Sequence, residues 1–594
     1  DSAEVAARAH DSVMSNQLDV PMLPPILAAS GRSDEAVTIA RAWARKQVGQ
    51  GNVHGAALAT NALAELLLRN GDARAALREA AAAESLAQRI NLTDQLIRAC
   101  RLQGQSRLGM NDRAGGLRLL NHAAVMAAAH PSAEAVLLSQ LALGDALAQA
   151  SLPDQALSAY DRAGRVVEDM TVRLDRDFER ARFRHGQLAA FDGAVGILLR
   201  QPATPRRLAQ LAAWSQRRKA ASLALAAGGH AGSVGARTSG LEDLRRRLAP
   251  GTALVDYQTL DSTSAALVVT ARGARVIALP IRPDSLRLLV DRLRQPLARS
   301  YAGRIDLARA PFDLAVAHAL YRAVMVPLTP LLGGIERLYI VPDGPLHLVS
   351  FDALVVEPPV DPANPAAYAA ARYAVDRFQI EILPTAQFLP SRDSGPVTAD
   401  PTRVLAINRD APGGESEVAA IRAAWPAGQV TVLEGADASE TAVRKATGKY
   451  TILHFATHAE ADDREPLASH LRLGADSVAD GFFHLEEIAQ DRRPVRLAVL
   501  SACETLSGRL YQGEGLMGLA RAFLAGGAQA VVATQWPIGP ASADLMGEFH
   551  RALAGGHEPG AALRSAKLVL RRQPATAHPF YWAGVILIRG ARAD

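Results

Sequence analysis

The chain has 594 residues but only two cysteines, Cys100 and Cys503. They lie in stretches that predict different domains, so a disulfide framework is not expected. Neither belongs to a CxxC pair, and a zinc site is therefore not expected either. No apolar run approaches the roughly 20 residues that a membrane span needs. The sequence thus predicts a multidomain globular protein without a metal, a cofactor or a membrane span.

Basic charge is also sparse and scattered. The formal net charge is +5, and acidic and basic residues alternate along the chain without a long basic block. Binding of nucleic acid therefore has little support. Most basic residues are arginines, and lysine occurs only at Lys46, Lys219, Lys445, Lys449 and Lys567.

The N-terminal part contains a repeat with a period of 40 residues. In three successive segments, small residues recur at three positions that are 12 and then 7 residues apart. Small side chains at these positions allow two antiparallel helices to approach closely, and each segment carries turn residues between the two helices. The small residues are Ala64, Gly104 and Gly144; Ala76, Gly116 and Ala156; and Ala83, Ala123 and Ala163. The turns are expected at Gly71-Asp72, Asn111-Asp112 and Pro153-Asp154.

This pattern resembles tetratricopeptide repeats, although its period exceeds the usual 34 residues, which implies extended helices or connections. Residues 31–45 fit half of an earlier unit, with Ala36 in register. We expect a tetratricopeptide-like helical solenoid over residues 1–227 and a Gly/Ser-rich linker over 228–240. Stacked repeats form a concave groove, which predicts that this part binds a protein or a peptide.

After residue 240 the pattern changes to strands that alternate with helices. The first strand candidates follow one another closely and predict an antiparallel group. Later apolar runs, separated by helical stretches, predict a mainly parallel sheet covered on both faces. Two of these runs end at His458, in "YTILHFATH", and at Cys503, in "RLAVLSAC". Parallel sheets bind ligands beyond the carboxyl ends of their strands, so the two side chains would meet if their strands are neighbours.

A histidine beside a cysteine is a chemically meaningful pair. The thiolate is the nucleophilic form of cysteine, and a nearby imidazole can remove the thiol proton. By itself, Cys503 would fit a small buried core residue, and a single histidine at a strand end often only faces water. His454 lies deeper in the same strand as His458 and fits a packed core residue better than a catalyst.

Several motifs in this region occur together. "HFATH" is followed about 45 residues later by "LSACET", then by "GEGLMGLARAFLAGGAQAVVATQWPI" and finally by "HPFYWAGVILI". The combination resembles the CHAT domain, a caspase-like peptidase family related to separase that often follows tetratricopeptide repeats. The resemblance implies a caspase-haemoglobinase-like α/β fold. It places a pseudo-catalytic half at about residues 241–335 and a catalytic half at 336–594.

The resemblance also implies roles for particular residues. His458 would be the general base and acid, Cys503 the nucleophile, and the backbone N–H groups of Cys503 and Ala459 the oxyanion hole. Family members commonly have glycine where this chain has Ala459. If that position required a positive φ, alanine would be strained by about 1–2 kcal/mol.

Three further residues are candidates for a substrate pocket: Asp343, Ser501 and Glu514. None is basic, so a caspase-like preference for aspartate is not expected. Asp343 could attract a basic substrate side chain, or it could simply form the turn at Pro342-Asp343-Gly344. Glu514 could shape the site or cap a helix that begins near Gly515.

The sequence therefore predicts a bacterial cysteine endopeptidase that cleaves a protein recruited by its repeats, with defence or regulated cell death as candidate settings. Two alternatives stay open: an inactive repeat scaffold that binds partner proteins, and an acyl-transfer enzyme or esterase with the same dyad. A reducing cytoplasm suits a working thiolate. A periplasmic location stays open because the chain begins at Asp1 rather than at methionine.

Overall fold

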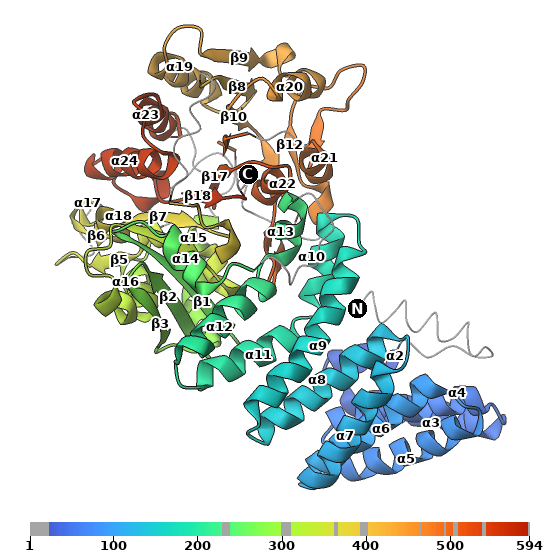
Figure 1. Ribbon diagram of the computed structural model, residues 1–594. Coiled ribbons are helices and arrows are strands. Elements are labelled where there is room, and N and C mark those ends of the chain that lie inside the picture. Colours follow the sequence, from blue (N-terminus) through green and yellow to red (C-terminus); the bar gives the residue numbers. More distant parts are fainter. Residues whose placement is uncertain are drawn as a thin grey trace. The chain divides into compact units, whose positions relative to one another are not determined.

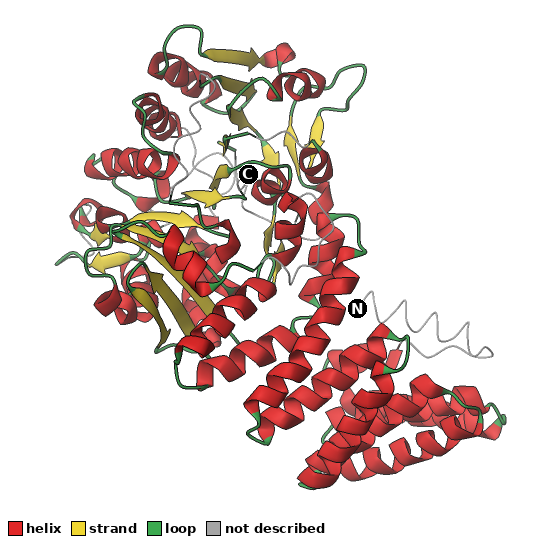
Figure 2. Ribbon diagram, in the orientation of Figure 1, coloured by secondary structure: helices red, strands yellow, loops and turns green. Residues whose placement is uncertain are grey.

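The computed structural model describes residues 23–228, 238–298, 311–361, 366–392, 402–462, 465–491, 495–502, 509–536 and 542–591. The chain forms two compact units. The helical unit contains the described residues up to Met170 together with Ala189–Ile197, and the sheet unit contains Thr171–Leu188 and the described residues from Leu198 onward. In the described ranges all strands belong to the sheet unit (Figure 2).

The helical unit consists of consecutive helices that lie side by side (Figure 1). Helices α3 to α6 each have 17 residues, so the 40-residue period arises from long helices and short connections. The helices are α2 (Leu23–Ala29), α3 (Ser33–Gly49), α4 (Val53–Arg69), α5 (Ala73–Arg89), α6 (Thr93–Gly109), α7 (Arg113–Ala128), α8 (Ala133–Gln149) and α9 (Pro153–Val172).

Most of the connections contain one residue with left-handed backbone, and these residues recur every 20 residues from Gly31 to Asn111 and again 40 residues later at Ser151. Glycine and asparagine supply most of them, because they adopt positive φ at low cost. In the third predicted turn the left-handed residue is Ser151, with φ of 60°, whereas Pro153 is the first residue of α9, where proline fits well. The series is Gly31, Gly51, Gly71, Asn91, Asn111 and Ser151.

The small residues of the repeat lie where helices touch. A Cβ atom added to Gly104 would lie 2.7 Å from Leu120 Cγ and 3.1 Å from the carbonyl oxygen of Gly116. Ala64 and Ala76 are fully buried. The predicted helical array, including the earlier helix with Ala36 buried, is confirmed.

We therefore expect Gly104→Ala to destabilise the helical unit, although alanine favours helix by about 0.5–1 kcal/mol over glycine. The new methyl group would overlap Leu120 and α7, and overpacking costs about 1–3 kcal/mol. The matched control is Gly49→Ala at the end of α3, where nothing lies within 4 Å of an added Cβ. Urea unfolding should show a loss for the first variant and no loss for the second. Equal stabilisation by both would contradict the close helix contact.

The sheet unit is built on an 11-stranded sheet. Its central strands are buried along their whole length, as expected when helices cover both faces. In spatial order the strands are β3 (Gly273–Ala278), β2 (Ser264–Thr270), β1 (Thr252–Thr259), β4 (Arg337–Val341), β7 (Gln379–Ile382), β18 (Val585–Arg589), β17 (Ala530–Thr534), β14 (Leu497–Leu500), β10 (Ile452–Thr457), β8 (Val404–Arg409) and β9 (Val430–Glu434).

The sheet is mainly parallel, and its parallel strands form two sets that run in opposite directions. Strands β1, β4, β7 and β18 run one way, and β17, β14, β10, β8 and β9 run the other way, because β18 and β17 pair antiparallel. The predicted antiparallel group at the start is β1–β2–β3. The carboxyl ends of the two parallel sets consequently lie at opposite edges of the sheet. Three strands of the first set, β4, β7 and β18, come after residue 335, where the sequence predicted the division between the two halves.

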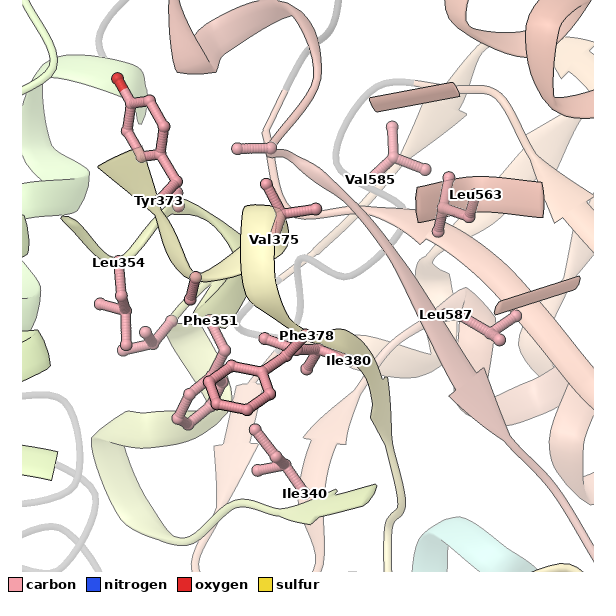
Figure 3. Packing of buried hydrophobic residues seen from close by; sticks show 14 of the residues in the cluster. Ile340, Phe351, Leu354, Tyr373, Val375, Phe378, Ile380, Leu563, Val585 and Leu587 are labelled. Atoms are coloured by element: carbon pink, nitrogen blue, oxygen red, sulfur yellow. The ribbon is translucent and has the colours of Figure 1, made fainter. Parts of the chain in front are cut away.

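A continuous apolar core runs along the sheet. It joins strands of both sets to helices α15 (Pro283–Ala298), α16 (Leu314–Val324), α23 (Ser542–Ala554) and α24 (Pro559–Arg572). Figure 3 shows part of this core, in which Phe351, Phe378 and Ile340 lie close together. The core makes the sheet a rigid frame that fixes the ends of its strands.

The predicted end of the repeats at residue 227 differs from the structure. Helices α12 (Pro205–Arg218) and α13 (Ala221–Gly228) belong to the sheet unit. Ser215 Oγ donates to Asp256 Oδ2 at 2.6 Å, and Lys219 Nζ lies 2.6 Å from Asp256 Oδ1, both buried at β1. An amphipathic pattern identifies a helix but not the core against which it packs, and this is why the sequence assigned α12 to the repeats.

Candidate active site

The strands that end near His458 and Cys503 are neighbours. Strands β10 and β14 pair in parallel, with Phe455 opposite Leu500, and the Ser501 N–H donates to the Phe455 carbonyl oxygen at 2.9 Å. His458 follows Phe455 by three residues, and Cys503 follows Leu500 by three. The adjacency that the sequence hypothesis required is present, while Cys503 itself lies outside the described residues.

His458 is half-buried at the end of β10. Its Nε2 atom lies 3.1 Å from the carbonyl oxygen of Asp410, the residue after β8. A carbonyl oxygen can only accept, so Nε2 carries the proton in this contact. The neutral imidazole then has its lone pair on Nδ1, which is the form that a general base requires.

His458 opens onto a hollow of about 270 Å³, whose lining includes Asp410, Arg472, Asp480 and Phe482. Asp410 is paired with Arg409 at 2.8 Å, and Asp480 accepts the N–H of Phe482 at 2.9 Å. In the described part of the chain, no group of three or more His, Cys, Asp or Glu side chains could hold a metal ion. The hollow therefore offers a polar, charge-lined space beside an imidazole.

Ala459 lies in β11 (Ala459–Glu460), which pairs antiparallel with β12 (His470–Arg472). The N–H of Arg472 donates to the carbonyl oxygen of His458 at 2.9 Å, so the next pair, Ala459 with Leu471, is of the non-hydrogen-bonded type. The N–H of Ala459 consequently points away from β12. Ala459 is not among the described non-glycine residues with positive φ, so alanine carries no left-handed strain here.

Ser501 follows β14 directly and is 8% exposed. Within the described residues, its buried hydroxyl has no hydrogen-bond partner. Its backbone is fixed to β10, at the edge where His458 lies. Of the three predicted pocket residues, Ser501 is the one that this edge contains.

Asp343 lies at the opposite edge, because β4 runs against β14 and β10. Its carboxylate is buried, 2.8 Å from Arg218, and accepts the Thr259 N–H at 2.6 Å. Burial alone would raise the pKa of Asp343, but Arg218 and Lys219 hold it below its usual value. The sequence suggested that Asp343 attracts a basic side chain of a substrate, but the basic side chain that lies against it is Arg218 of this chain. The strand-end argument failed here because it assumed one direction for all strands.

Glu514 does not cap a helix at Gly515, because that residue begins strand β16 (Gly515–Met517), which pairs with β15 (Arg509–Tyr511). The nearest helix, α22, starts only at Leu519. The Glu514 carboxylate is buried against Arg184 at 2.8 Å, Arg521 at 3.2 Å and Ser222 Oγ at 2.5 Å. It does not line the hollow at His458. Its partner Arg184, in α10 (Asp177–His185), is 330 residues away in sequence, beyond the reach of any local pattern.

A series of buried hydrogen bonds includes His454, which lies in β10. Trp425 Nε1 donates to His550 Nδ1 at 3.0 Å, His550 Nε2 lies 3.0 Å from His454 Nδ1, and His454 Nε2 lies 2.7 Å from Glu417. Indole can only donate, so His550 carries its proton on Nε2 and donates to His454, which in turn donates to Glu417. Burial, and to a smaller extent the neighbouring His454, holds the pKa of His550 well below its usual value. His454 is thus the core histidine that the sequence favoured.

These features define an α/β domain with a mainly parallel sheet and a candidate His/Cys pair in the segments that follow two neighbouring strands. Residues 314–590 match the family model of the CHAT domain, which confirms the resemblance that the sequence motifs indicated. None of the helices in the described ranges is long and apolar enough to cross a membrane.

Two curated relatives are similar to a small part of this chain, and one solved structure aligns with nearly all of it. Tetratricopeptide repeat protein 28 of Mus musculus is 39% identical over 98 residues, and the protein of the same name from Homo sapiens is 36% identical over 96 residues. Each match covers 16% of this chain and only 4% of the relative. The separase–securin complex of Saccharomyces cerevisiae aligns with a TM-score of 0.44 and 9% identity, over 96% of this chain and 52% of that chain.

Proposed function

We propose that the chain is a cysteine endopeptidase in which His458 acts as general base and acid and Cys503 acts as nucleophile. The observation that carries this proposal is the parallel, in-register pairing of β10 with β14. His458 and Cys503 each follow a paired residue, Phe455 or Leu500, by three positions in the sequence, which supports the proposal that they meet at the same edge of the sheet. The CHAT match over residues 314–590 adds independent support.

The chemistry follows from the groups at this edge. His458 Nδ1 removes the thiol proton of Cys503, and the thiolate attacks the carbonyl carbon of a peptide bond. The N–H of Ala459, which is directed away from β12, and the N–H of Cys503 stabilise the oxyanion. His458 then returns the proton to the leaving amine, which leaves a thioester. Water, deprotonated by His458, hydrolyses that thioester and restores the free thiol.

The helical unit supplies the second part of the proposal. Tetratricopeptide-like repeats are suited to binding proteins through their concave face. We infer that this unit binds the protein substrate, or a partner that delivers it. The substrate is then cut in an extended segment that enters the hollow beside His458.

The test compares Cys503→Ala with Cys100→Ala. Cys100 is buried, and burial followed by the Glu84 charge raises the pKa of its thiol to about 11, so it should stay unreactive. Both variants and the unmodified protein are incubated with a peptide library and with candidate partner proteins. We expect cleavage by the protein and by Cys100→Ala but none by Cys503→Ala. Iodoacetamide should likewise alkylate the protein and Cys100→Ala but not Cys503→Ala.

Equal cleavage by the protein and by Cys503→Ala would end the peptidase proposal. Capture of a partner by the full chain without any cleavage would favour the scaffold alternative. Hydrolysis of thioesters or esters but not of peptides would favour the esterase alternative.

A further inference from the structure

The hollow beside His458 lies on one side of that histidine. Its lining comes from the end of β8, from His458 itself and from the segment that runs from Arg472 in β12 to Phe482 in β13 (Phe482–His484). Among the described residues, none that lines the hollow belongs to β14 or follows it. Since β10 lies between β8 and β14 in the sheet, the hollow is on the β8 side of His458, away from the strand that precedes Cys503.

The proposed reaction determines which part of a substrate lies on this side. The Cys503 thiolate forms a bond to the carbonyl carbon, and the bond from that carbon to the peptide nitrogen breaks. His458 gives its proton to that nitrogen, so the leaving amine lies beside the imidazole while the acyl part stays on sulfur. The residues after the scissile bond therefore extend past His458 and into the hollow.

Arg472 is the charged side chain of the hollow whose hydrogen-bonding capacity is unused. Arg409 and Asp410 pair with each other at 2.8 Å, and Asp480 accepts the N–H of Phe482 at 2.9 Å. Within the described ranges, the exposed guanidinium group of Arg472 forms no hydrogen bond or ion pair. A guanidinium group carries several N–H donors in one plane and binds carboxylates through two of them.

The backbone holds Arg472 beside His458. The N–H of Arg472 donates to the His458 carbonyl oxygen at 2.9 Å, and its carbonyl oxygen accepts from Thr457 Oγ1. Arg472 is directly opposite Phe482 in the antiparallel pair of β12 with β13, so the two side chains lie on the same face of this pair. The Phe482 side chain is 40% exposed and offers an apolar surface next to the guanidinium group.

We propose that the hollow binds the fragment that leaves during cleavage, and that Arg472 selects an acidic side chain at one of the first two positions after the scissile bond. This inference rests on the proposed function, and it concerns the residues after the scissile bond rather than the residue before it. The methylene groups of a glutamate would lie against Phe482, and its carboxylate would bind Arg472. Asp480 lines the same hollow, so its charge weakens the preference.

The first experiment determines the new N-termini that the full chain produces from a peptide library. We expect aspartate and glutamate to be enriched at the first or the second position of the released fragments. The peptide that is cleaved best is then prepared with glutamate, glutamine or lysine at that position. Loss of a charge-assisted hydrogen bond corresponds to about a tenfold change, so kcat/KM should fall about tenfold for glutamine and further for lysine.

Substitutions in the protein test whether Arg472 is the cause. Arg472→Gln should lower kcat/KM about tenfold for the glutamate peptide and less than about twofold for the glutamine peptide. Arg472→Glu should make the lysine peptide the best substrate of the three. Asp480→Asn keeps an oxygen for the Phe482 N–H and should strengthen the preference for glutamate. The control is Arg275→Ala, an exposed arginine in the edge strand β3, which should change none of these ratios.

Binding provides a readout that does not depend on turnover. The three peptides are titrated into Cys503→Ala and into the double variant that also carries Arg472→Gln. The affinity for the glutamate peptide should be about tenfold lower in the double variant, and the affinity for the glutamine peptide should be the same in both.

Two results would overturn this inference and leave the proposed function standing. Cleavage that depends on Cys503 could proceed equally well with all three peptides, or the preference for glutamate could persist in Arg472→Gln. Failure of the proposed function is recognised separately, because no cleavage would then depend on Cys503, and the inference would fail with it.

Discussion

Replacement of His458 by alanine should lower kcat/KM by about 10²–10⁴-fold and leave the Tm unchanged. Proton transfer by a positioned side chain typically contributes a factor of this size. His458 is half-buried, contacts the carbonyl of Asp410 and lines an open hollow, so its removal leaves no cavity in the core. The rate is measured on the peptide that is cleaved best, and the Tm by circular dichroism.

His454 lies within β10, four residues before His458, and is the matched control, which should behave in the opposite way. It is fully buried between Glu417 and His550. His454→Ala leaves two buried polar groups without this partner, at a cost of about 1–3 kcal/mol for each. We expect a clear loss of Tm for this variant. Full activity of His458→Ala, with loss of activity in a stably folded His454→Ala, would show that the base has been assigned to the wrong histidine.

Replacement of Glu514 by alanine should destabilise the sheet unit by about 3–5 kcal/mol, the usual cost of breaking a buried ion pair. Its carboxylate and the Arg184 side chain are completely buried, and Arg521 is 7% exposed. Without Glu514, Arg184 loses the counter-charge at 2.8 Å, while Arg521 keeps Asp177. The β15–β16 hairpin also loses the contacts of Glu514 with α10 and α13.

The control for this prediction is Glu357→Ala. Glu357 pairs with Arg372 at 3.4 Å, but both side chains are more than 60% exposed, and such pairs contribute about 0–1 kcal/mol. Urea unfolding monitored by tryptophan fluorescence gives both free energies. A change in Glu514→Ala as small as that in Glu357→Ala would mean that water or another residue replaces the carboxylate.

The features that the sequence predicted correctly depend on residues close together in the chain, and the features that it misplaced depend on distant ones. Patterns that depend on near neighbours were readable: the small residues at Gly104 and Gly116, the apolar strand of residues 452–457 and the position of His458 after it. Each depends on the backbone period or on the size of a single side chain. Asp343 and Glu514 were misplaced, because strand direction and ion pairs across hundreds of residues leave no local trace.

By itself the sequence determined the helical repeats, the main strand candidates, and the positions of His458 and Cys503 after two of them. Only the tertiary structure decided that the sheet reverses between β18 and β17, that α12 packs with the sheet unit, and that Asp343 and Glu514 bind this chain's own arginines. The reason is that secondary structure and burial patterns are encoded over a few residues. The order and direction of the strands are instead set by the packing of the whole core. Every segment contributes to this packing, and no single segment determines it.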